Sequence, residues 1–481
     1  MSDTLEALAD RCLMPGFVGL EPPAWMLRRA PRLGGVCLYA RNVESPEQLE
    51  SLNRRLHGEN PGLVIGIDEE GGDVTRLEAR LGCSYPGSLA LGQVDDTDLT
   101  RRIAASMGAE LAAAGVDLDL APDADVNSNP ANPVIGVRAF GATPALVSRQ
   151  VVAFLDGLQG AGVAACVKHF PGHGATSLDS HLALPVVDED PRLGALAPFQ
   201  AAIAAGVKAV MSAHIVATSL DSEPATISPR VMTRLLRDEL GFDGLAITDG
   251  LEMRAIGDGV GIAQGAVAAL AAGCDLLCIG GGLAGEEVVD ELHRAIVVAV
   301  REGRLGEARL ADAARRIDAL AAWRSEQHQA GEVHRELGLE AARRAVTADN
   351  LQPIGDDVAV LRLSSTPSQA AGVVPWGLAS ALRDLGLRVT AVDVDHEPAD
   401  IAGLISKAGS GSLILVARNL HRHPWQVSTV EAVLAKRPEA IVVEMGLPAC
   451  RPEGARAYVA TRGAARVCGI AAAEVLAGVL V

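Results

Sequence analysis

The densest group of chemically active side chains in this sequence lies between Lys168 and His181. It consists of Lys168-His169-Phe170-Pro171-Gly172-His173-Gly174, and then of Asp179-Ser180-His181. Pro171, Gly172 and Gly174, with Pro185 shortly after the segment, disfavour a helix, so we expect a loop that follows the apolar run ending at Val167. In such a turn, Asp179 can accept a hydrogen bond from one imidazole nitrogen of His181, and the other nitrogen can exchange protons with a substrate. The spacing predicts a general acid/base pair.

Two other interpretations of this segment remain open. Loop histidines are commonly bonded to backbone carbonyls, and a single histidine here would favour that purely structural interpretation. A metal site is the second alternative, because His169, His173 and His181 are plausible ligands. The sequence shows no zinc-binding helix motif, and Lys168 would repel a bound cation. We therefore expect no metal and no other cofactor.

A second candidate is the aspartate that ends the apolar run Leu245–Thr248. A carboxylate at the carboxyl end of a buried strand points towards the site face of a barrel, where it can act as a nucleophile. Gly250, which follows Asp249, allows a substrate or another backbone segment to approach closely. Asp249 could instead cap the next helix, which is common at strand-to-helix junctions.

Three further segments carry polar groups after apolar runs. Asp68 and Arg76 belong to one of them, Arg138 to the next, and His214 follows Ser212 at the end of the third. Such donors and acceptors can hold the hydroxyl groups of a substrate. For either arginine alone, a surface salt bridge is the alternative interpretation.

The elements that must position these residues follow a regular pattern. Short apolar runs alternate with amphipathic segments between residues 35 and 280, as expected when crossover helices join parallel strands. The runs are Gly35–Tyr39, Leu63–Ile67, Val116–Leu120, Val163–Val167, Lys208–Met211, Leu245–Thr248 and Asp275–Ile279. With one irregular element they predict an eight-stranded (β/α)8 barrel of the TIM type. A doubly wound sheet is the competing fold, but polar residues at the carboxyl ends of several runs favour the barrel.

We expect the barrel domain to span residues 1–330 and a linker to span 331–351. Further apolar runs predict a smaller three-layer α/β/α sandwich domain over residues 352–481. This second domain shows no set of residues that we interpret as catalytic. One polar and aromatic group consists of His421, Arg422, His423 and Trp425. We interpret it as a solvated loop with one packed tryptophan. The alternative is that the group borders the barrel mouth or a subunit contact.

Composition narrows the classes of function. The 481 residues include 60 acidic and 42 basic ones, for a net charge of −18, so anionic nucleic acid and membrane surfaces are not expected as partners. No apolar run approaches the ~20 residues that span a bilayer. The acidic N-terminus does not resemble a secretory signal, so we expect a cytoplasmic location. The eight cysteines are scattered and predict no disulfide framework.

Taken in order, these motifs resemble the β-N-acetylglucosaminidases of glycoside hydrolase family 3. The resemblance covers about residues 10 to 325 and includes Gly34-Gly35-Val36 with Arg41-Asn42. It implies that His181 is the acid/base, Asp179 its partner and Asp249 the nucleophile. It also implies that the N-acetylglucosamine ring is held by Asp68, Arg76, Arg138, Lys168 and His169. The sequence departs from the family pattern at Ala175, where an aspartate is usual, and at Gly250, where aspartate or alanine is usual.

The activity implied is that of a retaining exo-β-N-acetylglucosaminidase acting on peptidoglycan fragments or related glycosides through a glycosyl-aspartate. Because neutral imidazole does not repel an anionic acceptor, phosphate could replace water, and a phosphorylase with inorganic phosphate as partner is an alternative. A catalytically silent sugar-binding protein is another. A β-glucosidase is less favoured, since that branch of the family generally lacks the histidine loop.

Overall fold

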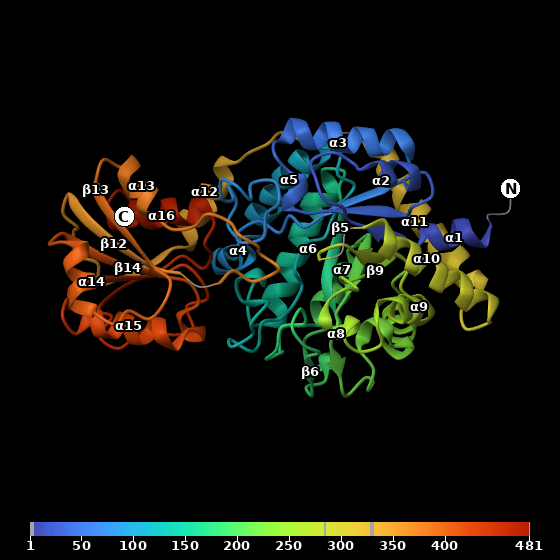
Figure 1. Cartoon of the computed structure of the whole chain (residues 1–481). Helices are drawn as coiled ribbons and strands as arrows, with labels where there is room; N and C mark the ends of the chain where they lie inside the picture. Colours follow the sequence, from blue (N-terminus) through green and yellow to red (C-terminus); the bar gives the residue numbers. More distant parts are fainter. Residues whose placement is uncertain (1–3, 283–284, 328–330, 365, 481) are drawn as a thin grey trace. The chain divides into compact units, whose positions relative to one another are not determined.

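The computed structural model describes residues 4–282, 285–327, 331–364 and 366–480. The chain forms two compact units. The first, called here the barrel unit, comprises Met1–Glu70, Thr100–Asn132 and Ala142–Val333. The second, called the sandwich unit, comprises Gly71–Leu99, Pro133–Gly141 and His334–Val481. Figure 1 shows both, coloured along the sequence.

The barrel unit is built on a curled parallel sheet. Six strands pair in the order β2, β3, β4, β5, β7, β9, and β10 pairs with β1 and bridges to β9 through Leu276 and Ile247. Strand β1 also packs beside β2. The strands are β1 (Leu13–Pro15), β2 (Gly35–Leu38), β3 (Val64–Ile67), β4 (Leu118–Asp119), β5 (Ala164–Phe170), β7 (Ala209–Ser212), β9 (Leu245–Thr248) and β10 (Leu277–Ile279). The expected α/β barrel is confirmed, and its eighth strand is β1.

Amphipathic helices connect these strands. Ser45 caps α3 by accepting a hydrogen bond from the amide of Gln48, and Pro46 occupies the first turn. Ser228 likewise accepts from the amide of Val231 at the start of helix Arg230–Glu239. The main helices of the unit are α1 (Leu5–Arg11), α3 (Pro46–Glu59), α5 (Thr97–Ala113), α6 (Pro144–Gly160), α7 (Ala197–Ala204), α9 (Ile262–Ala272), α10 (Glu286–Arg301) and α11 (Glu307–Glu326).

Apolar side chains from the strands fill the barrel unit. Met14, Cys37 and Leu118 are among the buried residues of this core, and Ile317 and Leu320 of α11 pack against them. Cys274 and Cys278 are buried free thiols, as their apolar surroundings in the sequence suggest. The strands therefore share one interior, which holds their carboxyl ends at a common edge.

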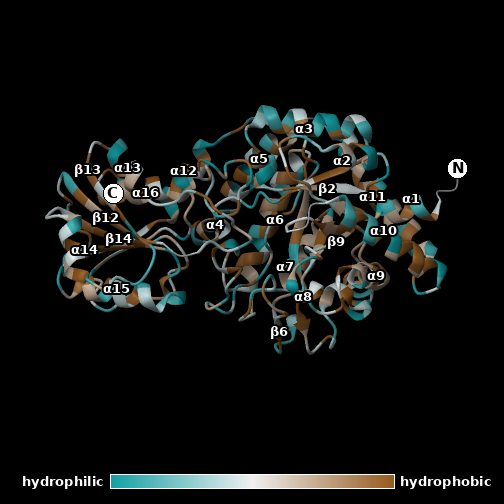
Figure 2. Cartoon of the chain, in the orientation of Figure 1, coloured by the Kyte–Doolittle hydropathy of each residue, from teal (hydrophilic) through white to brown (hydrophobic). Residues whose placement is uncertain are grey.

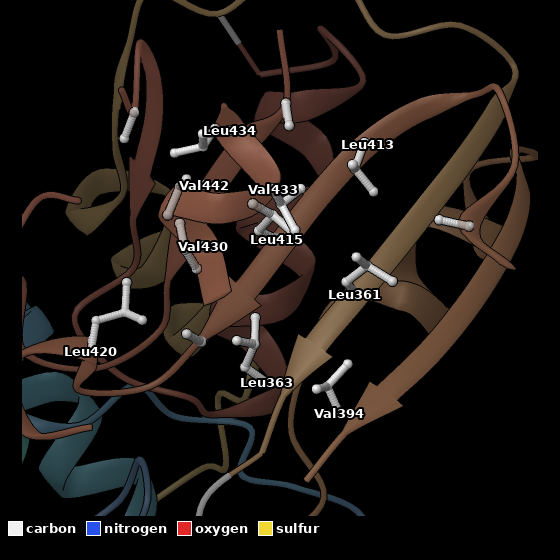
Figure 3. Close-up of a cluster of buried hydrophobic side chains, with 14 of the residues drawn as sticks. Leu361, Leu363, Val394, Leu413, Leu415, Leu420, Val430, Val433, Leu434 and Val442 are labelled. Carbon is white, nitrogen blue, oxygen red and sulfur yellow. The ribbon is translucent and has the colours of Figure 1, made fainter. Parts of the chain in front are cut away.

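The sandwich unit contains a six-stranded sheet in the order β11, β16, β15, β14, β12, β13, with only β11 antiparallel to its neighbour. Helices α14 and α15 contact one another, and α16 contacts α12 and α13. The layers form the expected three-layer sandwich, with the apolar strands β12 and β14 brown in Figure 2 and part of their core drawn in Figure 3. The elements are β11 (Thr347–Asp349), β12 (Asp357–Leu363), β13 (Arg388–Val394), β14 (Ser412–Ala417), β15 (Ile441–Glu444), β16 (Ala457–Ala460), α12 (Glu336–Ala345), α13 (Ala379–Asp384), α14 (Ile401–Ala408), α15 (Pro424–Leu434) and α16 (Arg466–Leu476).

The unit boundaries differ from the expected division of the chain. Residues 331–351 were expected as a linker, yet they contain α12 and β11, and β11 pairs with β16. The segment Gly71–Leu99 also belongs to the sandwich unit: Asp73 forms an ion pair with Arg418, and helix α4 (Ser88–Val94) packs on α12. Contacts between residues so far apart in the chain produce no periodic pattern in the sequence, so the sequence did not predict them. Among the described residues, no helix is long and apolar enough to cross a membrane.

Candidate active site

Polar side chains gather at the carboxyl ends of the barrel strands. Asp68 follows β3, Asp249 follows β9, and His214 follows β7. Lys168 and His169 lie within the last residues of β5, because this strand continues through Phe170 where a loop was expected. A register shift between Val167 and Phe170 interrupts the pairing of β5 with β7, and such irregularities redirect side chains at strand ends.

Lys168 forms an ion-pair cluster with two carboxylates. Its side chain is buried, and Nζ lies 2.7 Å from Asp68 Oδ1 and 2.7 Å from Glu70 Oε1. A buried ammonium requires such partners, since an uncompensated charge in this position would be very costly. The cluster fixes the position of Asp68, whose side chain remains partly exposed at 18%.

A buried aspartate holds the start of the histidine loop. Asp125 Oδ2 lies 2.8 Å from His169 Nδ1, and Asp125 Oδ1 accepts the amide of His173 at 2.5 Å. The ligand atoms of Asp123, Asp125 and His169 lie within 4.8 Å of one another. Because both oxygens of Asp125 already receive hydrogen bonds from this loop, we assign the group an anchoring role.

Asp179 and His181, predicted as an acid/base pair, lie within hydrogen-bond distance of each other. His181 Nδ1 lies 2.7 Å from Asp179 Oδ1, and the same oxygen accepts the His181 amide at 2.9 Å. Burial acts to raise the pKa of Asp179, but the hydrogen bonds from His181 outweigh it and lower the pKa. Asp179 therefore stays ionised and fixes the orientation of the imidazole.

The histidine loop is tied to the segment that carries Asp249. His173 is buried between the hydroxyls of Thr176 and Ser180, at 2.8 and 3.1 Å. The amide of Ala255, in α8 (Arg254–Gly257), donates to the carbonyl of Ser180 at 3.4 Å. These contacts bring the loop after β5 beside the loop after β9.

Asp249 is held as an anion. Its Oδ1 accepts the amide of Gly250 at 2.8 Å. Burial alone would raise its pKa, but the nearby imidazoles of His214, His169 and His181 lower the pKa to about 2. The carboxylate at the end of β9 is therefore ionised at neutral pH and lies in the electrostatic field of His181.

His214 has a different environment from the one expected of a substrate-binding residue. It is fully buried, with Nδ1 at 2.7 Å from the Thr226 hydroxyl and Nε2 at 3.0 Å from the carbonyl of Gly250. Burial lowers its pKa, which favours the neutral imidazole. Both ring nitrogens are thus engaged with the protein.

Glu252 is a structural component of the site that the sequence motifs did not identify. Its Oε1 accepts the amides of Gly280, Gly281 and Gly282, which follow β10. Arg41 donates to the carbonyls of Gly280 and Gly281 and stacks on the Tyr39 ring at 4.3 Å. In the sequence, only the closeness of Glu252 to Asp249 pointed to a role in the site. The partners of Glu252 lie about thirty residues further along the chain, so the sequence did not reveal them.

The two predicted arginines belong to the sandwich unit. Arg76 donates to the carbonyls of Ala370 and Ala371 at 2.8 and 3.3 Å, and Arg138 donates to the carbonyl of Val134 at 3.1 Å. In the barrel unit, the ends of β3, β5, β7 and β9 bring together the remaining predicted residues: Asp68, Lys168, His169, Asp179, His181, His214 and Asp249.

Comparison with known proteins identifies the family. The family model described as "Glycosyl hydrolase family 3 N terminal domain" matches residues 25–320. A "Beta-hexosaminidase A" of Pseudoalteromonas piscicida is 36% identical over 51% of this chain, which spans 45% of that protein. A "Beta-hexosaminidase" of Methylococcus capsulatus is 38% identical over 52% of this chain and 76% of its own length.

A solved structure matches the whole chain. It is that of a glycoside hydrolase family 3 beta-N-acetylglucosaminidase from a Paenibacillus species, and it is 33% identical with a TM-score of 0.90. The match covers 100% of this chain and 98% of the other. The strand ends, the histidine loop and these matches agree: the chain belongs to glycosyl hydrolase family 3.

Proposed function

We propose that this protein is a retaining exo-β-N-acetylglucosaminidase that releases terminal N-acetylglucosamine. The observation that carries the proposal is an ionised Asp249 in the electrostatic field of His181, whose Nδ1 is held by Asp179. A nucleophile and an oriented proton donor on neighbouring loops are the two groups that double displacement requires. The relatives, named as beta-hexosaminidases and a beta-N-acetylglucosaminidase, support this class of sugar.

In the first step, a carboxylate oxygen of Asp249 attacks the anomeric carbon and forms a glycosyl ester. The bond from that carbon to the leaving oxygen breaks, and the proton on His181 Nε2 passes to this oxygen. Asp179 remains ionised and stabilises the imidazolium before the transfer, because its pKa is lowered.

In the second step, water attacks the same carbon from the opposite side. His181 Nε2, now neutral, takes the proton of the water, and Asp249 leaves as a carboxylate. Two inversions restore the original configuration. The low pKa of Asp249 makes its carboxylate a good leaving group in this step.

We assign substrate binding to Asp68, Lys168 and His169 of the barrel unit. In this proposal, the carboxylate of Asp68 accepts hydrogen bonds from sugar hydroxyls, and its ion pair with Lys168 holds it in place. His214 is assigned a positioning role instead, since both ring nitrogens contact the protein and one of them holds Gly250 beside Asp249.

We propose water as the acceptor and peptidoglycan fragments or related N-acetylglucosaminides as substrates. The named relatives that share more than 30% identity are hexosaminidases and a beta-N-acetylglucosaminidase, which favours hydrolysis over phosphorolysis. The ionised Asp249 and the paired His181 are those of a working enzyme and argue against a silent sugar-binding protein.

The test is to follow cleavage of a chromogenic N-acetyl-β-glucosaminide by proton NMR, with and without phosphate. We expect the β-anomer of N-acetylglucosamine to appear first, and the rate to be unchanged by phosphate. First appearance of the α-anomer would exclude double displacement. Accumulation of a sugar 1-phosphate would show phosphorolysis, and no cleavage at all would favour the silent protein.

A further inference from the structure

The strand order of the sandwich unit creates a crevice between two neighbouring strands. Strand β13 pairs with β12 on one side. The chain then passes back across β12, and β14 pairs with β12 on the other side. The connections that leave β12 and β14 therefore diverge. In open α/β sheets, ligands bind outside the carboxyl ends of the strands at such a point, because diverging loops leave room there.

A cavity of about 410 Å³ lies at this edge of the sheet. It is lined by Ser364, Thr366, Asp395, His423 and Trp425. Ser364 follows β12 directly, Asp395 follows β13, and His423 and Trp425 stand at the start of α15, after β14. In Figure 3 the labelled Leu363 and Val394 mark the ends of β12 and β13 that precede this cavity. Its volume lies within the ~300–1,000 Å³ typical of small-molecule sites.

The segment that follows β14 forms one wall of the cavity, and hydrogen bonds fix its backbone. The buried Glu444, at the end of β15, accepts the amides of Asn419, Leu420 and Gly446 at 2.7, 2.9 and 2.6 Å. Gln426, which follows Trp425, is fully buried and donates to the carbonyl of Leu363. The side of the cavity formed by the segment after β14 is thus held by fixed backbone.

The lining side chains present hydrogen-bonding groups that the protein does not use. In the described part of the chain, the hydroxyls of Ser364 and Thr366 and the ring of His423 make no side-chain hydrogen bond. Trp425 is partly buried against the core of the sandwich and adds a flat apolar surface. Hydroxyls beside an aromatic ring match a ligand with alternating polar and apolar faces.

The charge of the lining selects against an anion. Asp395 carries the negative charge, with its Oδ1 at 2.6 Å from His396 Nδ1. Burial, and then the neighbouring Arg422 and His421, lower the pKa of His423, so its imidazole is neutral at pH 7. A phosphate in the cavity would meet a carboxylate without a cation among the five lining residues.

We propose that the sandwich unit carries its own binding site for a neutral saccharide, in the cavity between the loops that follow β12 and β14. One sugar ring stacks on Trp425, and its hydroxyls bond to Ser364, Thr366 and Asp395. This site consists only of residues of the sandwich unit. The choice of an N-acetylglucosamine saccharide as its ligand rests on the proposed function.

The test is calorimetric titration of the full chain with a thio-linked N,N′-diacetylchitobiose, whose sulfur bridge resists hydrolysis. We expect two binding sites in the unchanged chain. Trp425→Leu should weaken the sandwich site by about tenfold or more, whereas Trp425→Phe keeps an aromatic ring and should retain it. Equal numbers of sites in the leucine and phenylalanine variants would overturn the proposal.

Two additions guard against misleading results. Trp425 packs partly against the core, so Thr366→Arg, at an exposed position, should remove the same site without loss of folding, as a melting curve checks. Retention of the site in a folded Thr366→Arg chain would overturn the proposal, as would displacement of the saccharide by inorganic phosphate. The site that remains after Trp425→Leu belongs to the barrel; its absence would contradict the proposed function but not this inference.

Discussion

His214 Nε2 lies 3.0 Å from the carbonyl oxygen of Gly250, the residue that follows Asp249. Because a carbonyl oxygen can only accept, the His214 ring donates this hydrogen bond through Nε2, while Nδ1 lies 2.7 Å from the Thr226 hydroxyl. The buried imidazole therefore fixes the backbone that carries Asp249.

His214→Phe should consequently lower kcat more than it changes KM. The variant leaves the Gly250 carbonyl without its donor, a loss that typically costs about 1–3 kcal/mol in a buried position. Steady-state kinetics with a chromogenic N-acetyl-β-glucosaminide separates the two constants. The exposed His396→Phe is the matched control. A rise in KM with kcat unchanged would instead indicate direct substrate contact.

Asp249→Asn should reduce kcat by about 10³-fold or more, because the amide cannot form the glycosyl ester. The melting temperature should change little, since the amide oxygen can still accept the Gly250 amide. Asp243→Asn, six residues earlier and with an exposed side chain, should retain full activity. Equal activity of the two variants would remove Asp249 from the mechanism.

His181→Ala should show an effect that depends on the leaving group. Loss of a general acid typically costs about 10²–10⁴-fold. That loss should be large for a disaccharide, whose leaving oxygen needs a proton, and small for a nitrophenyl substrate. Comparison of kcat/KM for the two substrates measures the difference. A uniform loss with both substrates would point to a structural role for His181.

The titration of Asp249 should not appear in the pH profile of kcat/KM near neutral pH. Its pKa is about 2, lowered from an ordinary value of 3.8, so the stabilisation of its anion is complete above the ordinary value and is lost as the pH falls through about 2. We expect kcat/KM measured from about pH 4 to 8 to follow other groups. An acidic inflection that persists in His181→Ala and lies near pH 5 would contradict this assignment.

Lys168→Met should destabilise the protein and raise KM. The variant leaves Asp68 and Glu70 without the ammonium that lies 2.7 Å from each, and breaking a buried pair costs about 3–5 kcal/mol. Denaturant unfolding gives the loss in free energy. Adding Glu70→Gln should recover part of it, because one uncompensated charge is removed. No recovery would show that the cluster does not act through charge.

Local sequence patterns were sufficient for most of the barrel and for part of the site. Apolar runs that end in a polar residue identified β3, β5, β7 and β9, and with them Asp68, Lys168 and Asp249. Strand β1 was missed because Leu13–Pro15 is only three residues long and ends in proline, so it has no periodicity to read.

Residues whose role depends on distant partners could not be found in this way. Glu252 is explained only by the amides that follow β10, and Asp125 only by the loop after β5. Arg76 was predicted as part of a barrel segment, yet it donates to the carbonyls of Ala370 and Ala371, far along the chain. Such contacts are set by tertiary packing, which a single sequence does not encode locally.

The chain enters the sandwich unit three separate times, at Gly71, Pro133 and His334. A fragment made by cutting the gene near residue 351 would therefore discard Asp73, which binds Arg418, as well as α12, which packs on α16. Removal of the C-terminal region as a single block would leave Gly71–Leu99 and Pro133–Gly141 without the rest of the sandwich unit, to which they belong.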